Sequence, residues 1–127
     1  MRTTEGIYRE RAACPLYTAI AVIEGRWKPM IFQRLSERPL GFAELRRAMP
    51  RITPKVLREQ LRQMVADDLI VREELSPRRL GVHYRMTGHG RSLQPVFATL
   101  WRWGRLHLRR ADANRGTIAV SPARSVS

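Results

Sequence analysis

Three cationic side chains, those of Lys55, Arg58 and Arg62, recur at spacings of three and four residues. At about 100° per residue, this spacing places them on one side of a helix, roughly 110° from the apolar Leu57 and Leu61. Ammonium and guanidinium groups on such a face can bind phosphates and base edges in the major groove of DNA. A face of cations that only keeps the helix solvated is the alternative, and for a helix taken alone it is the better one. The neighbouring elements must therefore decide between the two interpretations.

Thr53 and a pair of arginines extend this candidate surface on either side of the helix. Thr53 precedes Pro54 and offers a hydroxyl N-cap, at a helix N-terminus where backbone N–H groups also favour a phosphate. Arg78 and Arg79 lie between two strand-like segments, and a hairpin tip that carries them could reach an adjacent minor groove. A charged loop that is merely soluble explains these two arginines equally well. The candidate DNA-binding residues are Thr53, Lys55, Arg58, Arg62, Arg78 and Arg79.

Cys14 is the one residue that offers sensor chemistry. It stands before Pro15 at a predicted helix start, with Arg9 and Arg11 nearby, and both features favour a thiolate. As the single cysteine it can form a disulfide only with another molecule, which fits a reducing compartment. The alternative is a small buried apolar residue.

Metal-dependent and catalytic functions find no support in the sequence. His83, His89 and His107 lack the spacing of metal ligands, and one cysteine cannot complete a thiolate site. The acidic pairs 67–68 and 73–74 are adjacent in sequence, so a helix or strand would splay them apart. We therefore expect no metal, no cofactor and no enzymatic activity.

Composition indicates a small globular protein with a polyanionic partner. The 127 residues suffice for one domain, and 24 Lys and Arg against 11 Asp and Glu give a net charge of +13. Charge alone does not choose between DNA, RNA and an anionic membrane surface. No apolar run approaches the ~20 residues of a membrane span, and the N-terminus lacks the apolar core of a signal peptide. We expect a cytoplasmic protein without membrane contact.

The elements that must position these residues follow from periodicity, caps and turn residues. Helices are predicted over 15–25, 27–36, 42–49 and 53–67, with a turn at 38–41 between the second and third. Strands are predicted over 70–74 and 82–86, with a hairpin tip at 76–81, before a long final helix from Thr87 to about Arg110. Residues 1–13 would form an arm, 14–111 the domain and 112–127 a disordered tail. A short helix, a turn, a longer basic helix and a basic hairpin are the layout of a winged helix-turn-helix domain.

The first and last helices carry more apolar positions than one core face requires. This surplus predicts a two-fold interface between copies of the chain, although burial of the final helix within its own domain is the alternative. The residues expected at the interface are Leu16, Ile20, Phe97, Leu100, Trp101 and Leu108.

Several motifs in this order resemble the HxlR-type winged helix regulators. The match runs from about residue 14 to 104 and includes Cys-Pro-Leu from Cys14, Gly-Arg-Trp-Lys from Gly25, Ile-Thr-Pro-Lys-Val-Leu from Ile52 and Val-His-Tyr-Arg-Met-Thr from Val82. The resemblance implies a homodimeric DNA-binding regulator of the wider MarR-like group, with dimer contacts from the terminal helices. It also implies a possible sensing role for Cys14, because some family members use an N-terminal cysteine to sense oxidants or electrophiles.

Three positions depart from the family pattern. Asp68 stands where glycine is frequent, His83 where glutamate is common, and Gly41 where arginine is common. An aspartate tolerates a left-handed helix C-cap less well than glycine, so the exit of the recognition helix is expected to be strained or differently shaped. The other two changes are expected to alter DNA contacts.

The sequence thus predicts an α+β winged helix-turn-helix domain with extra N- and C-terminal helices that form a dimer interface. Its predicted function is sequence-specific binding of double-stranded DNA as a homodimeric repressor, with a response to oxidants or electrophiles through Cys14. The alternative is a basic RNA-binding or nucleoid protein without sequence preference, which a specific-to-nonspecific binding ratio near one would favour.

Overall fold

The computed structural model describes residues 14–74 and 81–115. It divides into two compact parts, Met1–Arg91 and Ser92–Ser127, which are considered separately below. The expected N-terminal arm, the hairpin tip with Arg78 and Arg79, and the tail beyond residue 115 lie outside the described residues.

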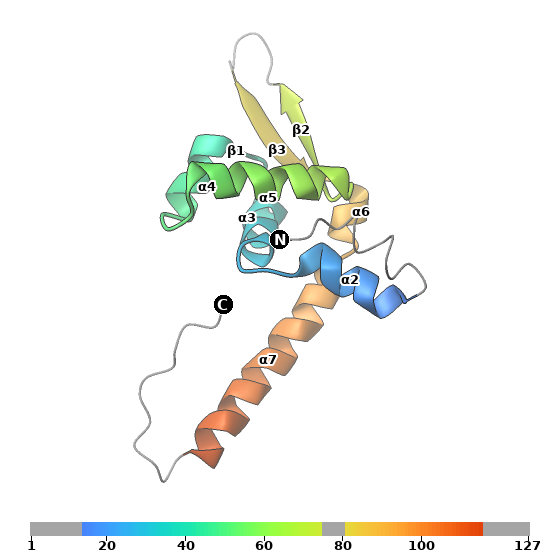
Figure 1. The fold of residues 1–127 in the computed structure, drawn as a ribbon, viewed down its shortest axis with the longest axis vertical. Coiled ribbons are helices and arrows are strands. Elements are labelled where there is room, and N and C mark those ends of the chain that lie inside the picture. Colours follow the sequence, from blue (N-terminus) through green and yellow to red (C-terminus); the bar gives the residue numbers. More distant parts are fainter. Residues whose placement is uncertain (1–13, 75–80, 116–127) are drawn as a thin grey trace. The chain divides into compact units, whose positions relative to one another are not determined.

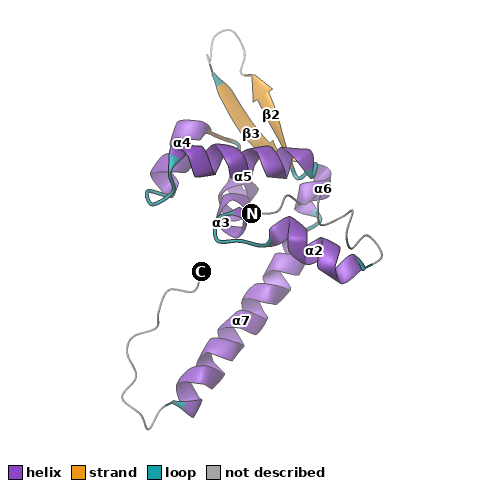
Figure 2. Cartoon of the chain, viewed as in Figure 1, coloured by secondary structure: helices purple, strands orange, loops and turns teal. Residues whose placement is uncertain are grey.

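The first part contains helices and a small antiparallel sheet in the predicted order (Figures 1 and 2). Its fold class, an α+β winged helix domain, is confirmed. The helices are α2 (Pro15–Ile23), α3 (Lys28–Glu37), α4 (Phe42–Ala48), α5 (Pro54–Ala66) and α6 (Gly88–Arg91). The strands are β1 (Leu40–Gly41), β2 (Ile70–Glu74) and β3 (Val82–Met86), and β3 lies between the other two.

Proline and cap residues start the helices where the sequence indicated. Pro15, Pro29 and Pro54 each lie in a first turn, where the missing N–H costs no helical hydrogen bond. The Thr53 hydroxyl accepts a hydrogen bond from the backbone N–H of Val56 at 3.2 Å, which makes it the N-cap of α5. Gly25, just after α2, has a φ of 103°, a conformation that glycine adopts readily.

The region 38–41 was predicted as a turn, and this was incomplete. Leu40 and Gly41 form the strand β1, paired with Tyr84 and His83 of β3. Two residues are too few for a period-two pattern to be seen in sequence. Leu40 is only 5% exposed, so β1 also contributes to the core.

The core of the first part lies among α3, α4, α5 and the sheet. Alternation along the hairpin brings Ile70 and Met86 opposite each other, and both are buried. The fully buried side chains include Ile31, Leu35, Leu45, Leu57, Leu61 and Met64. Leu57, Leu61 and Met64 belong to α5, so one face of this helix is packed in the core while the opposite face is exposed to solvent.

The single long helix expected from Thr87 is instead two helices. Thr87 caps α6, because its hydroxyl accepts from the N–H of Gly90 at 2.8 Å, but α6 ends at Arg91. A second helix, α7 (Gln94–Asn114), begins after a turn, with Pro95 in its first turn. Proline at this point cannot supply the N–H that would continue α6. The helix α7 also runs through Asn114, so residues 112–114 are helical and not part of a disordered tail.

The second part consists of α7, whose 21 residues include none that is buried. Large apolar side chains are exposed along it, among them Leu100 (49%) and Trp101 (65%). No helix among the described residues combines the length and apolar character required to traverse a lipid bilayer.

Candidate DNA interface

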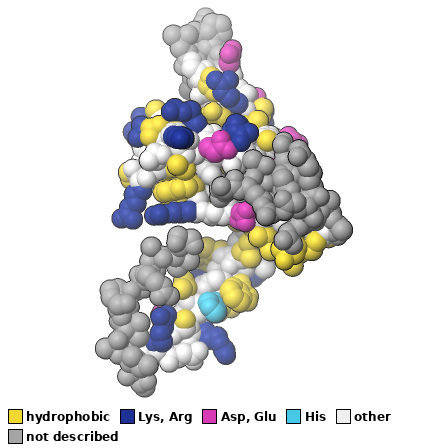
Figure 3. All heavy atoms as spheres, viewed as in Figure 1, with side chains coloured by type: hydrophobic (Ala, Val, Ile, Leu, Met, Phe, Trp, Pro, Cys, Tyr) yellow, Lys and Arg dark blue, Asp and Glu magenta, His cyan; other side chains and the backbone are white. Residues whose placement is uncertain are grey.

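The helix α5 presents a cationic face because its other side is packed in the core. Lys55, Arg58 and Arg62 are exposed, whereas Leu57 and Leu61 are at most 1% exposed. The N-terminus of α5, closed by Thr53, faces solvent together with Lys55. In Figure 3, Lys and Arg side chains gather over α4 and α5 with acidic side chains among them. This is the arrangement that the sequence predicted for a recognition helix, although DNA contact by these residues stays a prediction.

Arg58 is positioned by an aromatic ring of the preceding helix. Its Cζ lies 5.4 Å from the centroid of the Phe42 ring at the start of α4. A guanidinium stacked on a ring keeps its charge and its in-plane donors. The two helices of the helix-turn-helix are thus linked through the side chain of Arg58.

Arg62 is held differently, by a carboxylate on its own helix. Its Nε and Nη2 donate to the two carboxylate oxygens of Glu59, with 3.0 Å between Nε and Oε1. Gln63 donates to the same carboxylate from its Nε2 at 3.0 Å. The hydrogen bonds from Arg62 and then Gln63 lower the pKa of Glu59 to about 2, so this carboxylate is ionised at any physiological pH. The sequence pattern identified Arg62 but not the acid that orients it.

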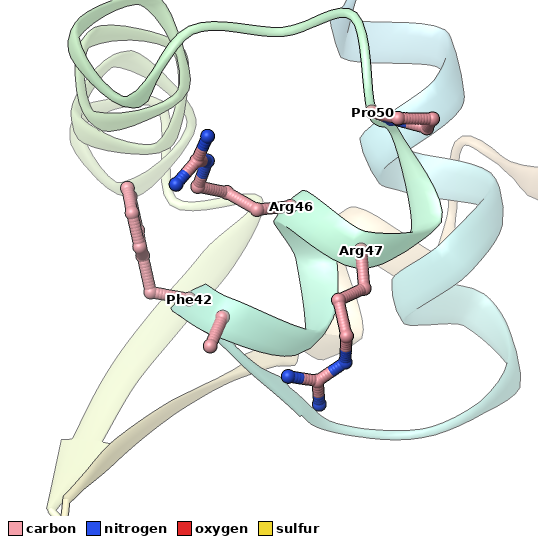
Figure 4. A pocket seen from close by; sticks show the side chains of 5 residues that line it. Phe42, Arg46, Arg47 and Pro50 are labelled. Carbon is pink, nitrogen blue, oxygen red and sulfur yellow. The ribbon is translucent and has the colours of Figure 1, made fainter.

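A shallow hollow on the outer side of α4 adds two arginines to this surface. It encloses about 440 Å³ and is lined by Phe42, Ala43, Arg46, Arg47 and Pro50. In Figure 4 Phe42 and Arg46 lie on the α5 side of α4, whereas Arg47 extends to the other side. Arg46 is exposed beside α5 and Arg47 is exposed on the other side of α4, which makes both candidates for phosphate contacts that were not selected from the sequence. The signal was present, since both are cations on the outer face of the predicted third helix.

A buried lysine lies under this surface and was not anticipated. Lys28, at the start of α3, is 3% exposed. Burial lowers its pKa, and the charges of Asp67, Glu24 and Glu59 oppose that effect. The acidic residue that pairs with Arg62 therefore also contributes to the electrostatic environment of Lys28.

The hairpin of β2 and β3, called the wing below, carries a charged cluster that includes His83, one of the departures from the family pattern. Glu73 of β2 lies opposite His83 of β3, and its Oε1 is 3.1 Å from His83 Nε2. Arg85 donates from Nε and Nη2 to the two oxygens of Glu73, at 3.1 and 2.8 Å. The bonds from Arg85 and His83 lower the pKa of Glu73 to about 2. His83 is thus a partner of Glu73 within the hairpin.

The exit of α5 adopts the left-handed conformation that the Asp68 departure implied. Asp68 has a φ of 60°, the only positive φ of a non-glycine residue among those described. The N–H of Leu69 donates to Met64 O at 3.0 Å and that of Asp68 to Val65 O at 2.9 Å. These two bonds form a Schellman motif, whose left-handed position is usually glycine.

Cys14 is the N-cap residue of α2 and is partly exposed. Its backbone carbonyl accepts from the N–H of Thr18 at 3.1 Å and from the Thr18 hydroxyl at 3.2 Å. The neighbouring Arg9 and Arg11 lie outside the described residues. Within one chain, Cys14 is therefore not the fully buried apolar residue considered as the alternative.

Of the residues predicted at a dimer interface, five are exposed in the single chain and Phe97 is partly exposed. Leu16 (69%) and Ile20 (45%) lie on α2, with Tyr17 (50%) between them. On α7, the predicted Leu100, Trp101 and Leu108 are joined by three further exposed apolar residues, namely Val96, Trp103 and Leu106.

Comparison with known proteins identifies the family. The model of the HxlR-like helix-turn-helix family matches residues 22–112. The chain belongs to this family. YybR of Bacillus subtilis (strain 168), an uncharacterised HTH-type transcriptional regulator, is 34% identical over 104 residues, which cover 82% of this chain and 83% of YybR.

Two solved structures share the fold. The redox regulator HypR in its reduced form superimposes with a TM-score of 0.72 at 31% identity, over 79% of this chain and 99% of HypR. The reduced transcriptional regulator YodB from B. subtilis gives a TM-score of 0.67 at 30% identity, over 71% and 89% of the two chains. The chain is thus a DNA-binding transcriptional regulator of the helix-turn-helix type.

Proposed function

We propose that this protein is a homodimeric repressor that binds a specific double-stranded operator through α5 and the wing. In this proposal α5 lies in the major groove, with Lys55, Arg58 and Arg62 toward bases and phosphates. Arg78 and Arg79 approach the backbone or minor groove from the wing. Occupation of a promoter by such a dimer would exclude polymerase, which is why we expect repression.

One observation carries the DNA-binding proposal. A helix of 13 residues packs one face in the core and presents cations on the other, behind a capped N-terminus and beside a second helix. A purely cationic surface would need no fixed side-chain geometry, whereas Arg58 is stacked on Phe42 and Arg62 is paired with Glu59. Fixed donors favour recognition of base edges over charge attraction alone.

The homodimer is supported by the apolar surface of α2 and α7. Around α7 the large apolar residues span a wide arc, while Arg102, Arg105 and Arg109 lie together on the remaining side. Trp101 and Trp103 are each more than 60% exposed in a single chain. Exposure of this extent is typical of a surface that binds a partner, and a second copy supplies the same apolar residues.

The decisive experiment compares a selected operator duplex with a scrambled one across a salt series. Arg58→Ala should cost about 1–3 kcal/mol on the operator and much less on the scrambled duplex, because a base contact is lost. Replacement of both Arg78 and Arg79 by alanine should weaken both duplexes alike and lower the salt slope by about one unit per contact. Arg109→Ala, on the basic side of α7, removes the same charge as the first variant and serves as the control.

Equal weakening of both duplexes by every α5 substitution would overturn sequence-specific recognition. The nonspecific RNA-binding or nucleoid function would then be the better account. Single-stranded RNA of the same length, included in the series, measures that function directly.

We also propose that Cys14 makes DNA binding responsive to thiol oxidants. Its partial exposure supports this proposal, as do the descriptions of HypR as a redox regulator and of YodB in a reduced form. With one cysteine per chain, the simplest reaction joins two copies. Two thiols lose two hydrogen atoms to an oxidant such as diamide, which becomes a hydrazine, and one intermolecular disulfide forms.

Diamide should therefore change operator affinity in the parent protein and not in Cys14→Ser. The serine variant should bind the operator within a few fold of the parent when neither is oxidised. Non-reducing electrophoresis detects the disulfide-linked dimer. An oxidant response that survives in Cys14→Ser would contradict a role for this residue.

A further inference from the structure

The exposed face of α5 contains a carboxylate, and this is unfavourable near DNA unless it has a role. Glu59 lies one residue after Arg58 and three before Arg62, and its side chain is 46% exposed. Each DNA phosphate carries a negative charge, so an ionised acid on a recognition surface opposes binding to every sequence alike. A neutral residue in place of Glu59 would avoid this cost, so the carboxylate needs an explanation.

The contacts of Glu59 indicate what the carboxylate does. It is held by Gln63, which is 5% exposed, and it grips the Nε and Nη2 side of Arg62. A carboxylate that takes both oxygens to one side of a guanidinium fixes the plane of that group. The remaining in-plane donors, on Nη1 and the second hydrogen of Nη2, form the end-on fork with which Arg62 would meet a base, in the plane set by Glu59.

A guanidinium fixed in this way is suited to one kind of base. The O6 and N7 atoms of guanine accept two parallel hydrogen bonds from an arginine whose plane is set. An unrestrained arginine on the same face could turn instead to a phosphate, which carries no sequence information. An arginine held by a carboxylate therefore gains specificity for a base, and it loses the affinity that a free phosphate contact would give.

We propose that Glu59 is a specificity-determining residue, which positions Arg62 to read a guanine and disfavours binding to other sequences. This inference rests on the proposed function, because it requires that α5 contact bases. Glu59 acts through Arg62 and is a positioning residue. Arg58, which is oriented by Phe42 and not by an acid, should read its own base independently of Glu59.

The test is selection from a randomised duplex library, with about 20 variable base pairs to span two half-sites one helical turn apart. The parent protein, Glu59→Ala, Glu59→Gln and Arg62→Ala are selected in parallel, with Glu37→Ala as the control. Glu37 is an exposed acid at the end of α3, so that variant makes the same charge change elsewhere. A surface ion pair contributes little to stability, so Glu59→Ala should fold, and its unfolding temperature verifies this.

Glu59→Ala should raise affinity for a scrambled duplex several-fold and lower the operator-to-scrambled ratio about tenfold. It should lose preference for guanine at one position of each half-site, and Arg62→Ala should lose preference at the same position. The double variant, with Glu59→Ala and Arg62→Ala together, should lose no more preference for guanine than either single variant, because both substitutions remove the same contact of Arg62 with guanine. Glu59→Gln keeps one acceptor oxygen and should be intermediate, while Glu37→Ala should keep the parental base profile.

An unchanged operator-to-scrambled ratio in Glu59→Ala would overturn the inference, as would losses of preference at different positions in the two single variants. If the parent protein itself selects no sequence, the proposed function fails and this inference fails with it. If the parent and Glu59→Ala select the same site equally well, only the role of Glu59 is disproved.

Discussion

The two parts of the chain treat their apolar residues in opposite ways. In the first part, Ile31, Leu45 and Leu57 are completely buried, and the helices and sheet share one core. In the second part, a helix of 21 residues buries none of its side chains. Hydrophobic periodicity is present in both. A helical apolar pattern therefore indicates a face that must be covered, but it does not indicate whether the same chain or another copy covers that face.

The largest expected effect separates the two parts by stability. Leu57→Ala should lower the free energy of unfolding by about 2–5 kcal/mol, since it leaves a cavity in the core of the first part. Leu108→Ala removes the same atoms from a residue that is 50% exposed in the single chain. Chemical denaturation monitored by circular dichroism measures both variants.

The two variants should depend differently on protein concentration. The cost of Leu57→Ala should remain at every concentration, whereas Leu108→Ala should matter only where copies associate, because its side chain is then buried between chains. Equal and concentration-independent losses in the two variants would show that α7 is covered by its own chain, which is the alternative to a dimer.

The next effect concerns association itself. The parent protein should sediment at micromolar concentration with about twice the mass of 14.7 kDa. Trp101→Ala should weaken the dimer by about 2 kcal/mol, or roughly thirtyfold, because a large exposed aromatic residue is the kind that dominates interfaces.

Arg102→Ala is the control for Trp101→Ala, since it changes the next residue of α7 on the basic side of the helix. It should leave the dissociation constant within about twofold, as surface charges contribute little. A parent protein that remains monomeric at micromolar concentration would remove the dimer and, with it, the expectation of a palindromic operator.

A third effect tests the close approach of α6 to Leu69 and Met86 in the first part. A Cβ atom at Gly90 of α6 would lie 2.1 Å from the backbone oxygen of Leu69 and 2.7 Å from Met86 Cε. Because the nearer obstacle is backbone, Gly90→Ala should destabilise the first part by about 1–3 kcal/mol. Gly88→Ala is the matched control, since nothing lies within 4 Å of its added Cβ. Similar unfolding midpoints for the two variants would contradict this close approach.

Sequence reasoning succeeded where a local chemical rule decides the structure. The N-cap at Thr53, the proline starts and the apolar stripe of α5 are confirmed, because each depends on residues within one or two turns. The short strand β1 was missed because its partner, Tyr84, is more than 40 residues away. The break between α6 and α7 was missed although Pro95, whose missing N–H prevents α6 from continuing, was visible in the sequence.

The candidate site shows the same division. The positions of Lys55, Arg58 and Arg62 on one face of α5 follow from spacing alone. The residues that orient Arg58 and Arg62 cannot be inferred from spacing. Phe42 meets Arg58 through tertiary packing of two helices, and Glu59 meets Arg62 by a choice of rotamers within one helix. Periodicity predicts the helix face from which a side chain projects, but it does not predict which residues contact the charged group at its end.

The smallest expected effect lies at the exit of α5, where local sequence and required backbone disagree. Asp68 occupies the left-handed position of the Schellman motif at a φ of 60°. Its backbone is fixed there by hydrogen bonds from its own N–H and that of Leu69, and by the Thr87 hydroxyl, which donates to Asp68 O at 2.6 Å. These bonds involve only the backbone of Asp68, so glycine would preserve all of them.

Asp68→Gly should therefore raise the free energy of unfolding by about 0.5–1 kcal/mol, since glycine adopts this φ without steric cost. Removal of a negative charge next to the C-terminus of α5 acts in the same direction, because that helix end is itself negative. Greater freedom of glycine in the unfolded chain opposes both effects and keeps the net gain small. Asp68→Asn separates the contributions, as it removes the charge and keeps the side chain. If Asp68→Asn equals Asp68→Gly in thermal unfolding, charge and not backbone strain is the source of the gain, and if both destabilise the protein, the side chain of Asp68 contributes to the fold.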